Sequence, residues 1–198
     1  QTKDLPDHDV LIRVLYSSLN YKDALSAAGN KAVTRQYPHT PGIDAAGTIV
    51  EDRSGTFENG LEVIITGYDF GMNTSGGFGQ YIRVPSDWVL PRPEGLTLRQ
   101  SMVYGTAGLT AAMSVDKLSS AVKPGHGDIL VTGASSGVGS MAISFLVKSG
   151  YTVAAVSGKT DDRAYLENLG VKEVLSIEEA TDISGRPLLK SRWAGVVD

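Results

Sequence analysis

The segment Thr132–Gly139, with the sequence TGASSGVG, constrains the fold of this chain more than any other. It follows a short apolar run, Ile129–Val131, and precedes a helical pattern of apolar residues. Glycines let the backbone turn tightly and approach a phosphate, and the unpaired N–H groups at the start of a helix attract negative charge. This order of strand, glycine-rich turn and helix predicts a phosphate-binding loop. Residues 132–139 are called the glycine loop below.

The apolar residues after the loop recur with the period of a helix. They fall at positions i, i+3, i+4, i+7 and i+8, which places them on one face that a core can bury. This stripe consists of Val138, Met141, Ala142, Phe145 and Leu146.

Three classes of protein share the letters of the loop. Short-chain dehydrogenases carry T-G-x-x-x-G-x-G near the N-terminus with a later Y-x-x-x-K pair, whereas here 131 residues precede the loop and neither Tyr151 nor Tyr165 has Lys four positions later. Residues 133–137 also match the nucleophile elbow G-x-S-x-G. Ser135 would then need a later histidine as its base, and the last histidine is His126. In the third class the loop follows a β-rich domain, and that order fits this chain.

The residues before the loop predict a small β barrel or sandwich. Short β-branched or aromatic runs alternate there with clusters of Gly, Pro, Asn and Asp. Thr97 is placed to cap a helix that begins near Leu98 and leads toward the loop, and we expect the domain boundary near Gly105. The expected strands are 10–16, 47–50, 62–66, 80–84 and 88–90.

Five linked motifs occur in the order found in one group of the medium-chain dehydrogenase/reductase superfamily. They are SLNYKD (18–23), PGIDAAG (41–47), GTAGLTA (105–111), the glycine loop and SGK (157–159). The chain resembles the zinc-free, quinone-oxidoreductase-like group that includes NADPH-dependent acrylyl-CoA reductases. The resemblance implies an α/β-plus-β fold: a GroES-like barrel domain at 1–104, then part of a Rossmann domain, a doubly wound parallel sheet, at 105–198. One departure is Ile177, where related chains often place an arginine that would contact phosphate.

The second domain is short for a complete one. A doubly wound sheet needs about six strands, but only 65 residues follow Gly133. They supply strands expected at 152–156, 173–175 and 195–197. We expect a fragment of a longer chain, called the complete protein below, with a further strand before Gln1. The resemblance implies that the remainder completes the sheet and supplies much of a homodimer interface.

Composition is that of an ordinary globular enzyme, with 41% hydrophobic and 20% charged residues. No apolar run approaches the length of a membrane span, and the first residues lack the apolar core of a signal peptide. A net charge of −4 without a basic cluster argues against a nucleic-acid partner, and the lack of cysteine excludes disulfides and thiol catalysis. We expect a cytoplasmic enzyme with a small-molecule substrate and no membrane partner.

The side chains expected to bind a catalytic zinc are missing. Zinc alcohol dehydrogenases, a neighbouring branch, use a cysteine and the histidine of G-H-E-x-x-G, and the corresponding positions here resemble Asn20 and Ile43. Neither side chain can replace those ligands. We expect His8, His39 and His126 to be solvated loop residues without a metal. Without a Lewis acid, hydride addition to an activated alkene or a quinone is easier than reduction of an isolated ketone.

Cofactor choice depends on the end of the second Rossmann strand, where an NAD enzyme places an acid about 20 residues after the loop. Residues 157–159 stand there without a carboxylate, and a hydroxyl, a glycine and a cation suit the 2′-phosphate of NADPH. The same residues also form a polar turn before a helix capped by Thr160, with Asp161 and Asp162 in its first turn. Arg163 is expected to be a solvated charge. The predicted cofactor contacts are Tyr21, Thr110, Ser135, Ser136, Gly137, Val138, Gly139, Ser157, Gly158 and Lys159.

Tyr21 and Asn20 are the predicted catalytic residues. From spacing alone, Tyr21 is equally an aromatic ring packed at a strand-to-helix bend with its hydroxyl in solvent. The resemblance places matching tyrosines beside the nicotinamide, where the hydroxyl would orient the ring or donate to the enolate formed after hydride transfer. A phenol keeps its proton at neutral pH, so its role would be that of a donor or a positioner. Asn20 would supply an amide to the nicotinamide or to a substrate oxygen.

Three further polar residues have open roles. Asp44 is expected to be structural and to fix the turn after Pro41–Gly42. Thr106 and Thr110 could bond the cofactor or only the local backbone.

Two classes of function stay open. One is an NADPH-dependent reductase of enoyl or acrylyl thioesters, enones or quinones. The other is a non-catalytic NADPH-binding or structural protein of the same fold. The presence of both Asn20–Tyr21 and a complete glycine loop favours the enzyme.

Overall fold

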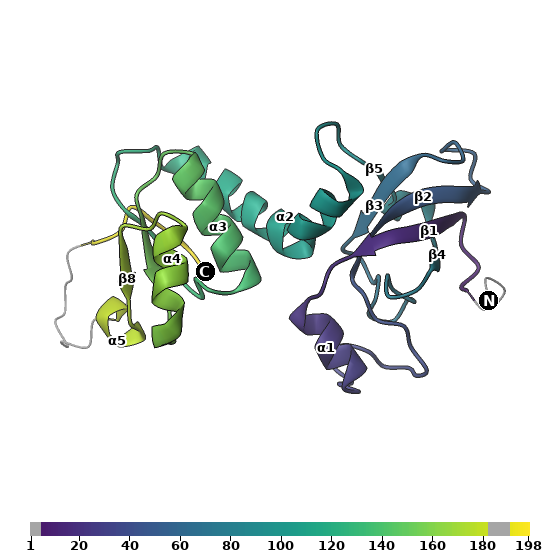
Figure 1. Ribbon diagram of the computed structural model, residues 1–198, viewed down its shortest axis with the longest axis horizontal. Coiled ribbons are helices and arrows are strands. Elements are labelled where there is room, and N and C mark those ends of the chain that lie inside the picture. Colours follow the sequence, from purple (N-terminus) through teal and green to yellow (C-terminus); the bar gives the residue numbers. More distant parts are fainter. Residues whose placement is uncertain (1–4, 182–190) are drawn as a thin grey trace. The chain divides into compact units, whose positions relative to one another are not determined.

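The computed structural model describes residues 5–181 and 191–198 (Figure 1). The chain forms two compact units, residues 1–106 and 107–198. In Figure 1 the first unit runs from purple to teal and contains an antiparallel sheet, and the second runs from teal to yellow and contains a parallel sheet.

The first unit is built on a five-stranded antiparallel sheet in the order β4-β1-β2-β3-β5. The β-rich first half was therefore predicted correctly, although two strands differ from expectation. The second strand begins at Asp44, because the small residues before Gly47 also pair with the third strand. Residues 86–88 form a 3₁₀ turn, so the last strand begins only at Leu90 and has two residues. The elements are β1 (Val10–Ser17), α1 (Tyr21–Ala27), β2 (Asp44–Asp52), β3 (Glu62–Thr66), β4 (Tyr81–Val84) and β5 (Leu90–Pro91).

The core of this unit consists of side chains that alternate along the strands, as the two-residue period of a strand requires. Gly47 on β2 allows the closest contact between two of these strands. A Cβ there would lie 2.0 Å from the carbonyl oxygen of Arg13 on β1, so no other residue fits without moving the sheet. The buried core residues are Val10, Ile12, Ala45, Ile49, Val63, Ile65, Phe70, Ile82, Val84 and Val89.

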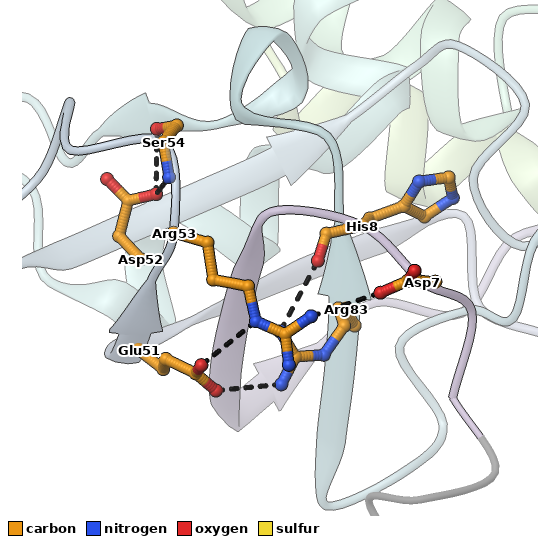
Figure 2. Close-up of polar contacts among 7 residues, drawn as sticks. All are labelled: Asp7, His8, Glu51, Asp52, Arg53, Ser54 and Arg83. Carbon is orange, nitrogen blue, oxygen red and sulfur yellow. Dashed lines mark hydrogen bonds and ion pairs between the residues drawn. The ribbon is translucent and has the colours of Figure 1, made fainter.

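A polar network links β4 to β2 across the strand between them, β1 (Figure 2). Arg83 on β4 has a buried guanidinium that donates to Glu51 on β2 at 2.8 Å and to the carbonyl of His8 at 3.3 Å. Arg53 donates to the other oxygen of Glu51 at 3.0 Å and to Asp7 at 3.0 Å. The hydrogen bond from Arg83, followed by that from Arg53, holds the pKa of Glu51 below its usual value. The network therefore ties the segment before β1 to the sheet.

The second unit contains a parallel sheet in the order β8-β7-β6-β9. This is the order of the first four strands of a doubly wound Rossmann sheet, which confirms the predicted fold and the predicted strands. Helices α3 and α4 pack against it (Figure 1). The elements are β6 (Ile129–Val131), α3 (Gly137–Lys148), β7 (Val153–Val156), α4 (Arg163–Asn168), β8 (Glu173–Leu175), α5 (Ile177–Ala180) and β9 (Gly195–Val197).

Both faces of this sheet are covered, as parallel sheets require. On one face, Ile129, Val131, Val153 and Ala155 belong to the main core with the buried side chains of α3. Side chains on the other face, such as Leu130, form a smaller cluster. The predicted stripe on α3 is confirmed: its members are fully buried or packed against the core, and Ile143 joins them.

Helix α2 (Leu98–Ala121) begins where its sequence predicts. The hydroxyl of Thr97 accepts from the backbone N–H of Gln100 at 3.2 Å, and the Gln100 side chain accepts from the Thr97 N–H at 2.9 Å, which forms a capping box. The helix is interrupted at Gly105, whose φ of +51° lies in the left-handed region. Within the described residues, no helix is both long and apolar enough to cross a membrane.

Candidate functional site

The glycine loop closes between β6 and α3 because its glycines carry no side chain. Gly133 adopts φ +50°, which favours glycine. A Cβ on Gly139 would lie 2.3 Å from the carbonyl oxygen of Gly133, so the first turn of α3 packs directly on the loop. Ser136 is the N-cap of α3, and its Oγ accepts from the Gly139 N–H at 3.1 Å. The predicted order of strand, loop and helix is confirmed.

Ser135 does not have the backbone of a nucleophile elbow. An elbow holds its nucleophile on a sharp, strained turn between strand and helix. Among the described residues, Tyr68 is the one non-glycine residue with a positive φ, and it lies in the other unit. Histidine 126, the last histidine of the chain, is exposed. The geometry therefore favours a phosphate loop over a hydrolase nucleophile.

A cavity of about 870 Å³ opens beside the glycine loop. It lies at the carboxyl ends of β6, β7 and β9, where the strand order of a doubly wound sheet reverses and dinucleotides bind. Its volume is within the usual range for ligand sites. Eight of the predicted cofactor contacts line it: Thr110, Ser135, Ser136, Val138, Gly139, Ser157, Gly158 and Lys159.

The two remaining predicted contacts do not line this cavity. Gly137 is the first residue of α3 beside the cavity, and a Cβ there would come within 3.3 Å of Ala107. Tyr21 belongs to the first unit. Sequence reasoning missed further lining residues, including Thr132, Ile177 and Asp198. Thr132 and Asp198 could have been found from their positions, because each directly follows a parallel strand. In the structure the Thr132 hydroxyl donates to the Asp198 carboxylate.

A carboxylate lies next to the residues predicted to bind the 2′-phosphate. The Ser157 hydroxyl donates to Asp162 Oδ2 at 2.9 Å and accepts from the Lys159 N–H at 3.2 Å. Ser135, on the glycine loop, lines the same cavity. The hydrogen bond from Ser135, then that from Ser157 and the charge of Lys159, lower the pKa of Asp162. Asp162 stands 23 residues after Gly139, just beyond the segment in which an acid was sought.

The helix after this turn begins later than predicted. Residues 160–162 form a 3₁₀ turn, and α4 starts at Arg163. Asp162 occupies the N-cap position, but its side chain accepts no capping bond because it is directed to the two serines. Arg163 is exposed as expected, although it also donates to the Val174 carbonyl at 3.1 Å and pairs with Glu167.

In the first unit, Asp44 is the centre of a buried hydrogen-bond network. One carboxylate oxygen accepts from the Ser18 hydroxyl at 2.5 Å, the Asn20 amide at 2.9 Å and the Thr106 N–H at 3.0 Å. The other accepts from the hydroxyls of Thr66 at 2.6 Å and Thr106 at 2.7 Å. Burial by itself raises the pKa of Asp44, but these hydrogen bonds, led by that of Ser18, outweigh it and lower the pKa.

The expected role of Asp44 in the turn after Pro41–Gly42 is wrong. That turn is fixed by Asp23, whose Oδ1 accepts from the N–H groups of Gly42 at 3.1 Å and Ile43 at 2.9 Å. Asp23 lies in the first turn of α1, so its buried carboxylate reaches this loop, whereas Asp44 accepts from the Thr106 N–H, directly after the break in α2 at Gly105. Gly105 permits the approach, because a Cβ there would lie 2.7 Å from Asp44 Oδ2.

Asn20 and Tyr21 stand together at the start of α1. The Asn20 amide nitrogen donates to Asp44 at 2.9 Å and also lies 3.2 Å from the Ser18 hydroxyl oxygen, so the amide is held by partners within the unit. The side chain of Tyr21 is different: it is 80% exposed, and no residue that the structure describes hydrogen-bonds its hydroxyl. The interpretation of Tyr21 as a packed ring is therefore wrong.

Two of the three histidines are not simple solvated loop residues. The His39 ring bonds the Gly71 carbonyl at 2.9 Å, and His8 lies half-buried with its ring 6.3 Å from that of Trp88. His126 is exposed as expected. Across residues 5–181 and 191–198, no cluster of three or more His, Asp or Glu side chains is arranged to hold a metal ion.

Residues 6–94 match the alcohol dehydrogenase GroES-like domain. The crystal structure of the yhdH oxidoreductase from Salmonella enterica, in complex with NADP, is 45% identical and superposes over 99% of this chain with a TM-score of 0.93. The chain belongs to the quinone oxidoreductase-like medium-chain dehydrogenases/reductases. The crystal structure of Bacillus subtilis yhfP, with NAD bound, is 46% identical over 99% of this chain with a TM-score of 0.92.

A curated relative in this family is the acrylyl-CoA reductase AcuI of Ruegeria pomeroyi, which is 43% identical over 98% of the present chain. This chain spans about 60% of the length of these relatives: 59% of AcuI and 60% of each of the two structures.

Proposed function

We propose that the complete protein transfers hydride from NADPH to an activated alkene, either an enone or an enoyl or acrylyl thioester, or to a quinone, without a metal. The observation that carries this proposal is the cavity at the carboxyl ends of the parallel strands, which gathers the glycine loop and Ser157–Lys159. The name of AcuI and the NADP in the yhdH structure support it.

We assign the two halves of the chain different tasks. Residues 1–104 would form the substrate and catalytic domain, and residues 105–198 would hold the cofactor. The first N–H groups of α3 would bind the pyrophosphate, because a helix leaves them without intrahelical acceptors and they carry the positive end of the helix dipole; the N–H of Gly139 is already taken by the Ser136 hydroxyl. Thr110 lines the same cavity and would bond the cofactor. The complete protein is proposed to be a cytoplasmic homodimer.

The proposed hydride transfer requires a hydrogen-bond donor near the acceptor's oxygen rather than a metal. The bound cofactor supplies the hydride, and negative charge then develops on the conjugated oxygen of the acceptor, where a hydrogen-bond donor stabilises it. The exposed hydroxyl of Tyr21 is such a donor. The Asn20 amide is bonded to Asp44 and Ser18, so we propose that it mainly positions the start of α1 and with it Tyr21.

Lys159→Ala should weaken NADPH binding by about 5- to 150-fold, because a charge-assisted contact to the 2′-phosphate is lost. NADH lacks that phosphate, so its dissociation constant should change little. Both constants can be measured by titration calorimetry on the complete protein. The matched control is Lys148→Ala, which removes an exposed lysine at the end of α3 that does not line the cavity. Equal NADPH affinity in Lys159→Ala and Lys148→Ala would contradict the phosphate assignment.

A further inference from the structure

Asp162 uses the same groups that a 2′-phosphate would need. The Ser157 hydroxyl has one hydrogen and gives it to Asp162 at 2.9 Å, while its oxygen accepts from the Lys159 N–H. Ser135, on the glycine loop, and Lys159 line the same cavity, and both lower the pKa of this carboxylate, Ser135 by a hydrogen bond and Lys159 by its charge. A phosphate can gain these donors only by displacing Asp162 or by binding beside it.

The two cofactors differ in how they meet this carboxylate. The 2′-phosphate of NADPH is an acceptor with negative charge, so it competes with Asp162 for donors and is repelled by it. The 2′-hydroxyl of NADH is a donor, and a carboxylate near the end of the second strand is the usual acceptor for it. One carboxylate therefore opposes NADPH and supports NADH.

Asp162 is also free to change its partner without unfolding its own helix. Its side chain makes no capping bond to α4, and the neighbouring Arg163 is directed to the Val174 carbonyl and to Glu167. The described contacts that hold the carboxylate are those to the two serines and Lys159.

We propose that Asp162 is a specificity-determining residue that competes with the 2′-phosphate for Ser135, Ser157 and Lys159, and so narrows the preference for NADPH and keeps NADH binding accessible. This inference rests on the proposed nucleotide site. It agrees with the two solved relatives, since yhdH is in complex with NADP and yhfP has NAD bound at nearly equal identity to this chain.

The test is Asp162→Asn in the complete protein, which removes the charge and keeps the size of the side chain. Dissociation constants for NADPH and NADH are measured by titration calorimetry. We expect NADPH to bind about 5- to 30-fold more tightly, the size of one repulsive charge contact near a protein surface. NADH should bind equally or more weakly. Asp161→Asn is the matched control, because it makes the same change in net charge at an adjacent exposed residue.

The outcomes separate this inference from the proposed function. Failure of the wild-type protein to bind either nucleotide would refute the nucleotide site itself. Suppose instead that NADPH binding depends on Lys159, but Asp162→Asn and Asp161→Asn give the same ratio of NADPH to NADH dissociation constants. This result would overturn the role of Asp162 and leave the nucleotide site intact. Weaker NADPH binding in Asp162→Asn also overturns it, because Asp162 would then organise the serines for the phosphate. If Asp162→Asn fails to fold, Asp162→Ser removes the same charge and the ratio is measured there.

Discussion

Asp44→Ala should lower the free energy of unfolding of the first unit by about 3 to 5 kcal/mol, the usual cost of removing one partner from a buried charged network. Asp44 has no exposed surface, and its carboxylate accepts from five groups on three separate segments. The substitution leaves a cavity and deprives the Thr106 N–H of its acceptor. Urea unfolding followed by circular dichroism measures the change.

The pH dependence gives a second readout for the same residue. The pKa of Asp44 in the folded state lies below its ordinary value of 3.8. The ionised carboxylate therefore contributes its full stability above about pH 3.8, and this contribution is lost as the pH falls through the folded-state pKa. The difference in stability between wild type and Asp44→Asn should be largest near pH 7 and shrink in acid. Asp9→Asn, an exposed control, should change the free energy of unfolding only slightly. Equal stability of Asp44→Asn and wild type would contradict the network's importance.

Tyr21→Phe should reduce kcat and kcat/KM together by about ten- to a thousandfold, the range for a lost oxyanion donor or proton-transfer group. The ring is 80% exposed, so removal of the hydroxyl should leave the free energy of unfolding nearly unchanged. Steady-state kinetics of the complete protein with a reactive acceptor measure the effect. Tyr16→Phe, an exposed tyrosine on β1, is the control.

Other outcomes assign Tyr21 a different role. Loss of NADPH affinity with unchanged kcat would make it a cofactor-positioning residue. Unchanged kinetics at both saturating and limiting acceptor would rule out any role in the reaction and leave the proton to water or to the substrate itself.

Much of the fold could be predicted because its signals are local. The glycine loop, the stripe on α3 and the Thr97 helix cap each depend on residues within a few positions of one another, and all three are confirmed. The residues that line the cavity could be predicted for a different reason. Parallel strands bring the residues that follow them to one edge of the sheet.

The network around Asp44 could not be predicted, because its partners are distant in sequence. Ser18, Thr66 and Thr106 lie 26, 22 and 62 positions from Asp44, and no short pattern brings them together. The position of Asp162 depends on a 3₁₀ turn where the sequence predicted an α-helix. A polar residue in a first turn is ordinarily a capping or surface residue, so its link to two serines of the site required the tertiary structure.

The central claim is tested most directly by the initial rate of NADPH oxidation by the complete protein after treatment with a chelator. Acrylyl-CoA, an enone and a quinone serve as separate acceptors. We expect turnover with at least one of them at a rate that the chelator does not change. Tight NADPH binding without turnover of any acceptor, or turnover that stops on chelation and returns with zinc, would contradict a metal-independent reductase.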